Sequence, residues 1–169
     1  MKSCLFADPP DVPTIIVDTR EHPQAIRKIL RDFEAEGVTV IRSKLYVGDY
    51  QRIDNGLLVV DRKQNLAEIA GNLTQGHKRF RDELERAKRA KIELVVLCEH
   101  GGQIRTLDDV AEWRNPRLRE SPQAITGERL AKVMRTMSER YGVRWEFCDK
   151  RRTGKRILEI LGGGHGEQE

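Results

Sequence analysis

The stretch VGDYQRIDNGLLVVDRK, residues 47–63, constrains the fold more than any other part of the sequence. It reads as two apolar strands joined at Asp54-Asn55-Gly56, a typical turn sequence. Asp49 precedes the turn, and Asp61 and Lys63 follow it. The sequence therefore predicts an antiparallel hairpin that carries two acids and a lysine at its base.

The turn decides whether these side chains converge or are scattered surface charge. Residues two apart on a strand share a face, so Asp61 and Lys63 point the same way. A two-residue turn of Asn55-Gly56 would set Asp49 opposite Arg62, on the wrong face. The charges at the hairpin base would then not form one site.

A three-residue turn over 54–56 instead sets Asp49 opposite Asp61. Glycine accepts the left-handed conformation at the last position of such a turn. We expect this longer turn, although a bulge near Gly48 could also bring Asp49 to the required face.

Short apolar runs alternate with amphipathic segments along the rest of the chain, a pattern typical of an α/β fold. We expect strands at 14–21, 38–41, 91–100 and 143–148, and helices at 22–37, 65–73, 77–90, 127–141 and 153–161. Pro23 suits the first turn of its helix. Together these elements predict a mixed sheet with helices on both sides. We expect a single domain over 1–161 and a disordered tail over 162–169.

The net charge of +4 and the pI near 9.1 permit nucleic-acid binding without requiring it. The sequence has no apolar run near the roughly 20 residues that span a bilayer, and its N-terminus is too weak for a secretory signal. The three cysteines lack metal-ligand spacing, and Cys98 and Cys148 read as core thiols. We expect a protein of the reducing cytoplasm.

If the hairpin acids converge, they match a known kind of chemistry. Two carboxylates can hold Mg²⁺ or Mn²⁺, which prefer oxygen ligands and keep several waters. A bound ion polarises a phosphate oxygen, and a nearby lysine can orient the attacking water or steady the developing charge.

Four segments together resemble the XPF-type structure-specific DNA endonuclease family, and especially its short stand-alone bacterial and phage members. They are IIVDTREHP, LYVGDY, VVDRK and VVLCEH, in the family's order and near its spacing over residues 14–100. The later GERLAKVMRTMSERYGVRWEFC, with TGKRILEIL after it, looks like the closing helix–strand–helix of the same domain. The resemblance implies a restriction-endonuclease-like fold and metal-dependent phosphodiester hydrolysis.

The same resemblance assigns roles to residues. It implies metal ligands at Asp49, Asp61 and Asp18, with Lys63 as the catalytic lysine. Support for the site comes from four further residues: Glu21, Arg20, Arg62 and Glu68. Asp18 and Glu21 could instead be a strand-end charge and an acid near a helix N-terminus.

Two departures from the family pattern affect the site. The family usually has Glu where this chain has Asp61, which is one methylene shorter. The family often has an acid four residues after the lysine, where this chain has Ala67. Glu68 follows one step later and either substitutes for that acid or is an ordinary solvated helix residue.

The helix over 77–90 carries the basic residues expected to contact DNA: Lys78, Arg79, Arg81 and Arg86. Such residues would position a duplex by its phosphates. The alternative is a solvated face with i,i+4 pairs such as Arg79 with Glu83. The family also implies a possible homodimer through its late helices, although the apolar stripe over 130–141 could equally be buried in its own core. Because the chain ends before the family's usual DNA-binding domain, a separate DNA-binding partner is possible.

The sequence therefore predicts an Mg²⁺- or Mn²⁺-dependent endonuclease acting on branched or flapped DNA in repair or recombination. One alternative is a non-catalytic DNA-binding or scaffold module on the same fold. A second is a metal-dependent hydrolase of nucleotides or RNA. The presence of Asp49, Asp61 and Lys63 together favours the endonuclease.

Overall fold

The computed structural model describes residues 12–162 of the chain. Its six-stranded sheet has the order β2-β1-β3-β4-β5-β6. Strand β1 is parallel to β2, β4 to β5 and β5 to β6, while β3 is antiparallel to both β1 and β4. The strands are β1 (Thr14–Val17), β2 (Thr39–Arg42), β3 (Tyr50–Arg52), β4 (Asn55–Lys63), β5 (Glu93–Cys98) and β6 (Arg144–Phe147).

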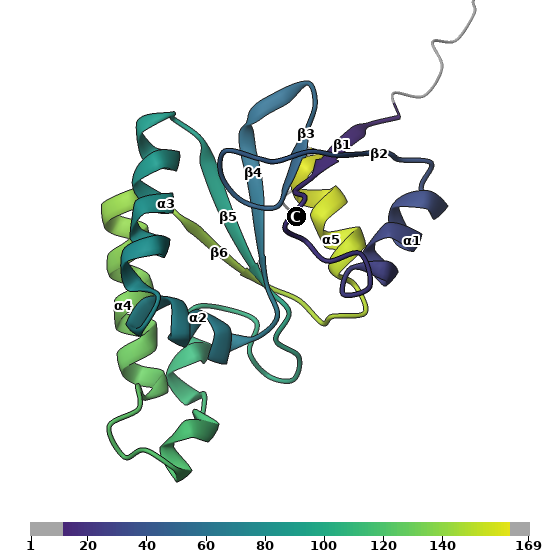
Figure 1. Cartoon of the computed structure of the whole chain (residues 1–169). Coiled ribbons are helices and arrows are strands. Elements are labelled where there is room, and N and C mark those ends of the chain that lie inside the picture. The colour runs from purple at the N-terminus through teal and green to yellow at the C-terminus, as the bar shows by residue number, and fades with distance from the viewer. Residues whose placement is uncertain (1–11, 163–169) are drawn as a thin grey trace, which may run out of the picture.

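Helices cover both faces of this sheet, as the sequence predicts. The helices are α1 (Arg27–Ala35), α2 (Leu66–Thr74), α3 (His77–Arg89), α4 (Gly127–Tyr141) and α5 (Thr153–Leu161). Two 3₁₀ turns, Asp109–Glu112 and Pro116–Arg119, lie in the segment before α4. Helices α1 and α5 lie on one side of the sheet, and α2, α3 and α4 lie on the other (Figure 1).

Each face of the sheet has its own apolar core. The core under α1 and α5 includes Ile26, Phe33 and Ile157, all fully buried. The core under the other three helices includes Leu84 of α3 and Leu130 of α4. The central strands β4 and β5 contribute to both cores, which explains the continuous apolar run of a strand buried on two faces.

Local sequence signals place some of the helix ends. Thr126 accepts a hydrogen bond from the Arg129 amide at 3.3 Å and begins α4, and Gly142 ends that helix at a φ of 72°. Helix α1 begins later than expected, at Arg27, because residues 23–26 form a turn after Pro23. Helix α5 has the bounds expected from the sequence, but Arg152 at its N-cap position makes no side-chain cap bond.

The turn of the hairpin is shorter than expected, so the prediction of a three-residue turn is wrong. Arg52 pairs with Asn55, and Ile53 and Asp54 form the turn between them. The Arg52 guanidinium donates to the Asp54 carboxylate at 2.8 and 2.6 Å, which holds this tight tip. A register shift between Gln51 and Arg52 then restores the pairing that the longer turn was expected to give.

The apolar stripe of α4 is largely buried within the domain. Leu130 and Met134 are fully buried and Met137 is 8% exposed, while Val133 and Tyr141 pack against the same core as partly buried residues. Packing within the domain therefore accounts for this stripe without a second chain.

Some expectations concern parts of the chain that the structure does not describe. The tail expected over 162–169 lies outside the described residues except for Gly162, and so does the N-terminal segment with Cys4. Within residues 12–162, no helix is both long and apolar enough to cross a bilayer.

Candidate active site

The base of the β3–β4 hairpin brings Asp49 and Asp61 together. Tyr50 pairs with Val60 and Gln51 with Val59, which sets Asp49 opposite Asp61, the register expected from the sequence. The Asp49 carboxylate also accepts a hydrogen bond from the Arg62 amide at 2.8 Å. The two carboxyl groups adjoin, and the charge of Asp61 helps to raise the pKa of Asp49.

Gly48 makes this approach of the two strands possible. Its φ is +66°, a conformation that side chains rarely adopt. A Cβ atom at this position would lie 2.5 Å from Cγ1 of Val59 and 3.1 Å from the Val60 carbonyl oxygen. The chain therefore needs glycine here to set Asp49 against β4.

Lys63 adjoins Asp61 on the same face of β4. Its Nζ lies 2.8 Å from Oδ2 of Asp61 and donates to Oδ1 at 3.1 Å. Although Oδ2 is this close to the ammonium, it accepts no well-oriented hydrogen bond and is buried. The Lys63 ammonium also lies 5.7 Å from the centre of the Phe80 ring.

Glu83 of α3 is a further acid at this site, and the sequence analysis missed it. Its Oε1 accepts a hydrogen bond from the Gly48 amide at 3.0 Å, so the side chain turns inward instead of pairing with Arg79. One signal was available: Glu83 lies three residues after Phe80, beside the buried stripe of α3. An acid on the apolar side of a helix indicates a polar partner across the interface.

Negative charge is in excess at the hairpin base. Burial raises the pKa of Asp49 well above its ordinary value, and the neighbouring charges of Asp61 and Glu21 add to this. Burial and Asp61 raise the pKa of Glu83 in the same way, against the opposing effect of the Gly48 amide. Burial lowers the pKa of Lys63, but the charge of Asp61 outweighs it and the pKa lies above its ordinary value.

Asp18 lies at the end of β1, next to this cluster, but its carboxylate binds other partners. One carboxylate oxygen accepts from Nε of Arg20 at 2.6 Å and from its amide at 2.8 Å. The other oxygen accepts from the Leu45 amide at 2.6 Å. Burial opposes ionisation of Asp18, but Arg20 and the Leu45 amide outweigh it and lower the pKa of Asp18. The structure thus gives Asp18 its own cation, apart from the pair of Asp49 and Asp61.

Arg62 points to the opposite face of β4 and binds two other acids. Its Nε lies 2.8 Å from Oε2 of Glu21, and its Nη1 lies 3.0 Å from Oε2 of Glu99. The Tyr50 hydroxyl donates to the same Glu21 oxygen at 2.8 Å. The Arg62 side chain is only 5% exposed, so it serves as the buried cation of this network. Tyr50 and Glu99 are further residues of the network that the sequence analysis did not assign.

Glu68 caps the start of α2. Its Oε2 accepts from the Gln64 amide at 2.7 Å, while the Asn65 side chain accepts from the Glu68 amide at 2.9 Å. This is a reciprocal pair of capping bonds like a capping box. Glu68 is exposed, and its charge also contributes to raising the pKa of Lys63.

Three of the four basic residues expected to contact DNA share one side of α3. Lys78, Arg79 and Arg86 line a shallow hollow of about 450 Å³ together with Asp82 and the turn at Gln75-Gly76. Arg81 does not line this hollow and lies 3.9 Å from Glu85 of the same helix. His22 and His77 are both exposed.

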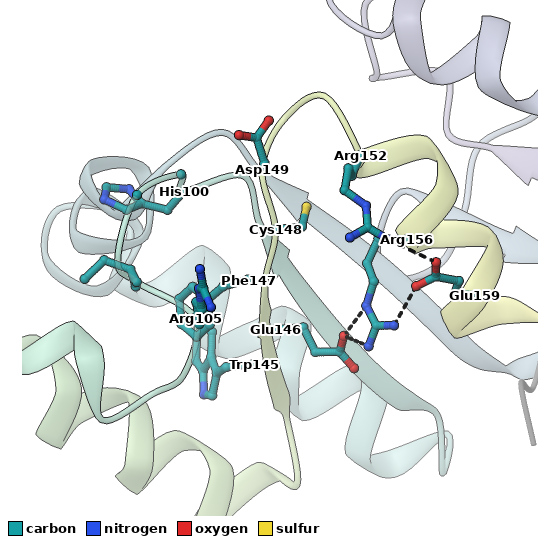
Figure 2. A pocket seen from close by; sticks show the side chains of 13 residues that line it. His100, Arg105, Trp145, Glu146, Phe147, Cys148, Asp149, Arg152, Arg156 and Glu159 are labelled. Atoms are coloured by element: carbon teal, nitrogen blue, oxygen red, sulfur yellow. Dashed lines mark hydrogen bonds and ion pairs between the residues drawn. The ribbon is translucent and has the colours of Figure 1, made fainter. Parts of the chain in front are cut away.

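A second, larger hollow of about 820 Å³ lies along β6, away from the hairpin (Figure 2). Among its charged residues, Arg156 donates to Glu146 at 2.9 Å and to Glu159 at 2.8 Å. Trp145 and Phe147 line one side of it and also pack against the core under α4. The hairpin carboxylates are not part of this hollow, so it gives no support to the chemistry expected of them.

The hairpin base fits a divalent cation. It holds the carboxylates of Asp49, Asp61 and Glu83 against one adjoining ammonium, and Oδ2 of Asp61 is buried without a hydrogen bond. Repulsion among buried acids is relieved by a cation. Among the described residues, no group of three or more His, Cys, Asp or Glu is placed to hold an ion by itself. An Mg²⁺-like ion fits such a site because it binds through one or two carboxylates and completes its shell with water or phosphate oxygens.

We expect Asp49→Asn to stabilise the metal-free protein at pH 8, by of the order of 1 kcal/mol. Burial, Asp61 and Glu21 raise the pKa of Asp49, so the folded chain holds this proton more tightly than the unfolded chain. The unfolded chain loses this proton near about pH 4, whereas the folded chain keeps it up to the raised pKa. The folded protein is therefore progressively destabilised as the pH rises between these two values. The amide oxygen of asparagine can still accept the Arg62 hydrogen bond.

Urea midpoints measured in EDTA from pH 3.5 to 8.5 test this expectation. The advantage of Asp49→Asn should be full at the upper end of the range and should vanish near pH 3.5. Asp54→Asn is the matched comparison at the exposed tip of the same hairpin. Arg52 lowers the pKa of Asp54, so this change should cost stability at high pH, the opposite of the gain expected for Asp49→Asn. An advantage of equal size at every pH would contradict the electrostatic origin.

A mixed sheet with helices on both faces, with two carboxylates converging at the end of a hairpin, is a restriction-endonuclease-like fold. The ERCC4 domain model matches residues 17–159. The chain therefore belongs to the ERCC4 domain family, a family of nucleases, which confirms the family and the fold predicted from the sequence.

Two solved structures are similar to the chain. XPF from Aeropyrum pernix superposes with a TM-score of 0.63 at 22% identity, over 92% of this chain and 66% of that chain. XPF from Aeropyrum pernix in complex with DNA gives a TM-score of 0.61 at 25% identity, over 88% of this chain and 62% of that chain. The chain thus spans just under two thirds of the length of these relatives. No curated protein matches it.

Proposed function

We propose that the chain is a divalent-metal-dependent endonuclease that hydrolyses phosphodiester bonds of branched, flapped or otherwise structured DNA in repair or recombination. The observation that carries this proposal is the excess of buried carboxylate at the hairpin base, at Asp49, Asp61 and Glu83. Membership of a nuclease family and the DNA complex of the similar Aeropyrum pernix XPF support it. A location in the cytoplasm, beside nucleoid DNA, follows from the proposal.

In this proposal Asp49 and Asp61 hold Mg²⁺ or Mn²⁺, which would activate water and polarise the phosphate. Lys63 holds the Asp61 carboxylate in place through its 2.8 Å contact. Without an ion, the charge of Asp61 raises the pKa of Lys63. A protonated Lys63 would stabilise negative charge on the phosphate. Glu83 fixes the Gly48 amide and hence the loop that presents Asp49.

Asp18, Arg20 and Arg62 support the site through contacts of their own. Both oxygens of Asp18 are engaged, and its bond to the Leu45 amide fixes the loop over 43–49. Arg20 neutralises Asp18, and Arg62 neutralises Glu21 on the other face of β4. A direct role of Asp18 as a metal ligand stays a prediction, and it would require Arg20 to move away.

The basic side of α3 is the proposed path of the DNA backbone. Lys78, Arg79 and Arg86 line one hollow there, and such contacts bind phosphates irrespective of sequence. Arg81 stays a predicted contact on the neighbouring side of the helix. A homodimer through the late helices or a separate DNA-binding partner could add further DNA contacts.

Cleavage of labelled fork, flap, Holliday-type, linear duplex and single-stranded DNA tests the proposal. With Mg²⁺ or Mn²⁺ we expect nicking of at least one branched substrate, at a rate at least about tenfold above that of linear duplex. EDTA should remove the activity, because the buried acids then lack their cation. A pure preparation that nicks none of these DNAs with either ion would refute the enzyme assignment, and retained binding would then favour a non-catalytic module.

A further inference from the structure

Tyr46, three residues before Asp49, has an unusually exposed side chain. Its side chain is 61% exposed, although its neighbours Leu45 and Val47 are 7% and 1% exposed. Single exposed apolar side chains are common and by themselves indicate nothing. Tyr46 differs from such residues in the rigidity of its backbone and in its charged neighbour.

The loop that carries Tyr46 is fixed on both sides of the tyrosine. Before it, the Leu45 amide donates to the buried Asp18 carboxylate at 2.6 Å. After it, the Gly48 amide donates to Glu83 at 3.0 Å. A ring on a fixed backbone loses little conformational freedom when it binds a ligand, since only the side-chain torsions remain to be ordered.

A cation lies beside the exposed ring. The guanidinium of Arg86 is 5.9 Å from the centre of the Tyr46 ring, within the range of a cation–π contact. Arg86 also lines the hollow on α3 with Lys78 and Arg79, so the ring lies where this basic side meets the hairpin loop. An aromatic face bordered by basic side chains is the combination that binds single-stranded nucleic acid.

The distance between Tyr46 and Asp49 limits which nucleotides the ring can reach. Three residues of extended chain span at most about 11 Å, so Tyr46 lies within that distance of Asp49 along the backbone. The ring is therefore near enough to the carboxylates to meet a nucleotide close to a phosphate bound there. Bases inside a duplex already stack on their neighbours, so a protein ring can stack only on a base that is unpaired or splayed out.

We propose that Tyr46 is a specificity-determining residue that stacks on an unpaired nucleobase beside the cleaved phosphate, with Arg86 contacting the backbone of the same strand. This inference rests on the proposed function, because it takes DNA as the ligand of the hairpin site. It assigns the choice of cleavage position, relative to a junction, to the loop before Asp49 rather than to the carboxylates themselves.

Fork and flap DNAs that carry 2-aminopurine at successive positions around the junction test the stacking directly. In EDTA, where no cleavage is expected, the unsubstituted protein and Tyr46→Phe should quench the fluorescence at one or two unpaired positions. Tyr46→Ala should lose this quenching and bind the fork about tenfold more weakly. Leu57→Ala is the matched control, because Leu57 is also 61% exposed but lies beyond the turn of the hairpin.

The same variants are then compared for cleavage with Mg²⁺. We expect Tyr46→Ala to lose its preference for the fork over linear duplex and to cut at scattered positions, while Tyr46→Phe and Leu57→Ala cut as the unsubstituted protein does. Quenching and cleavage positions that do not change in Tyr46→Ala would overturn the inference and leave the endonuclease proposal intact. Quenching that depends on Tyr46 in a protein that never cuts would refute the endonuclease instead.

Discussion

Asp61→Asn should lower the rate of DNA cleavage by about 10³-fold or more. Asparagine has the shape of aspartate but no charge, so it would hold a divalent cation poorly and would leave Lys63 without its 2.8 Å ionic partner. Binding of DNA should persist, because the proposed phosphate contacts lie on α3 and not on β4. The loss should therefore fall on turnover rather than on affinity.

Single-turnover cleavage of a fork with Mg²⁺ and fluorescence anisotropy of the same DNA measure the two effects separately. Asp54→Asn provides the control, since it makes the same change at the exposed tip of the same hairpin. Near-UV circular dichroism establishes that both variants are folded. A rate within about tenfold of the unsubstituted protein would contradict a role for Asp61 in holding the ion, because losing a required charge costs far more.

The outcome also separates the enzyme from a module that only binds DNA. In a non-catalytic module on the same fold, nothing would favour two adjoining buried acids at Asp49 and Asp61, since their repulsion lowers stability. The expected gain in stability of Asp49→Asn and the expected loss of activity of Asp61→Asn thus point to one cause. Both follow if the hairpin base is arranged for a cation that the protein does not itself supply.

The fold was predictable from the sequence because its signals are local. Apolar runs define β1, β4 and β5, and cap residues such as Thr126 define helix ends. The register of the hairpin was also predictable, since only one register brings Asp49 against Asp61. The turn was not, because Arg52 pairs with Asp54 and the register shift beyond that pair restores the alignment.

The partners of the site residues depend on contacts between distant segments, and the sequence does not encode these locally. Glu83 reaches Gly48 across 35 positions, and its spacing from Arg79 suggested an ordinary surface pair instead. Glu99 and Glu21 meet at Arg62 only because β5 and β1 lie on either side of the hairpin. Which acid receives which cation is therefore a property of the sheet order and not of any motif.

Arg62→Ala should have the largest effect on stability, because Arg62 is the cation that pairs with both Glu21 and Glu99. Arg62 is 5% exposed, and its two partners Glu21 and Glu99 are 14% and 12% exposed. Removing the guanidinium leaves two largely buried carboxylates without a cation, which costs about 3–5 kcal/mol. For a domain of this size that corresponds to a fall in Tm of roughly 10 °C.

Thermal and urea unfolding of four proteins test this expectation: the unsubstituted chain, Arg62→Ala, Arg62→Ala with Glu21→Gln, and Arg151→Ala. The double variant should recover part of the loss, because glutamine removes one of the two stranded charges and can still accept from the Tyr50 hydroxyl. Arg151→Ala should leave the midpoint unchanged, since that arginine is 80% exposed. Equal midpoints for Arg62→Ala and Arg151→Ala would show that the buried network does not hold β1, β4 and β5 together, and the hairpin acids would then need another support.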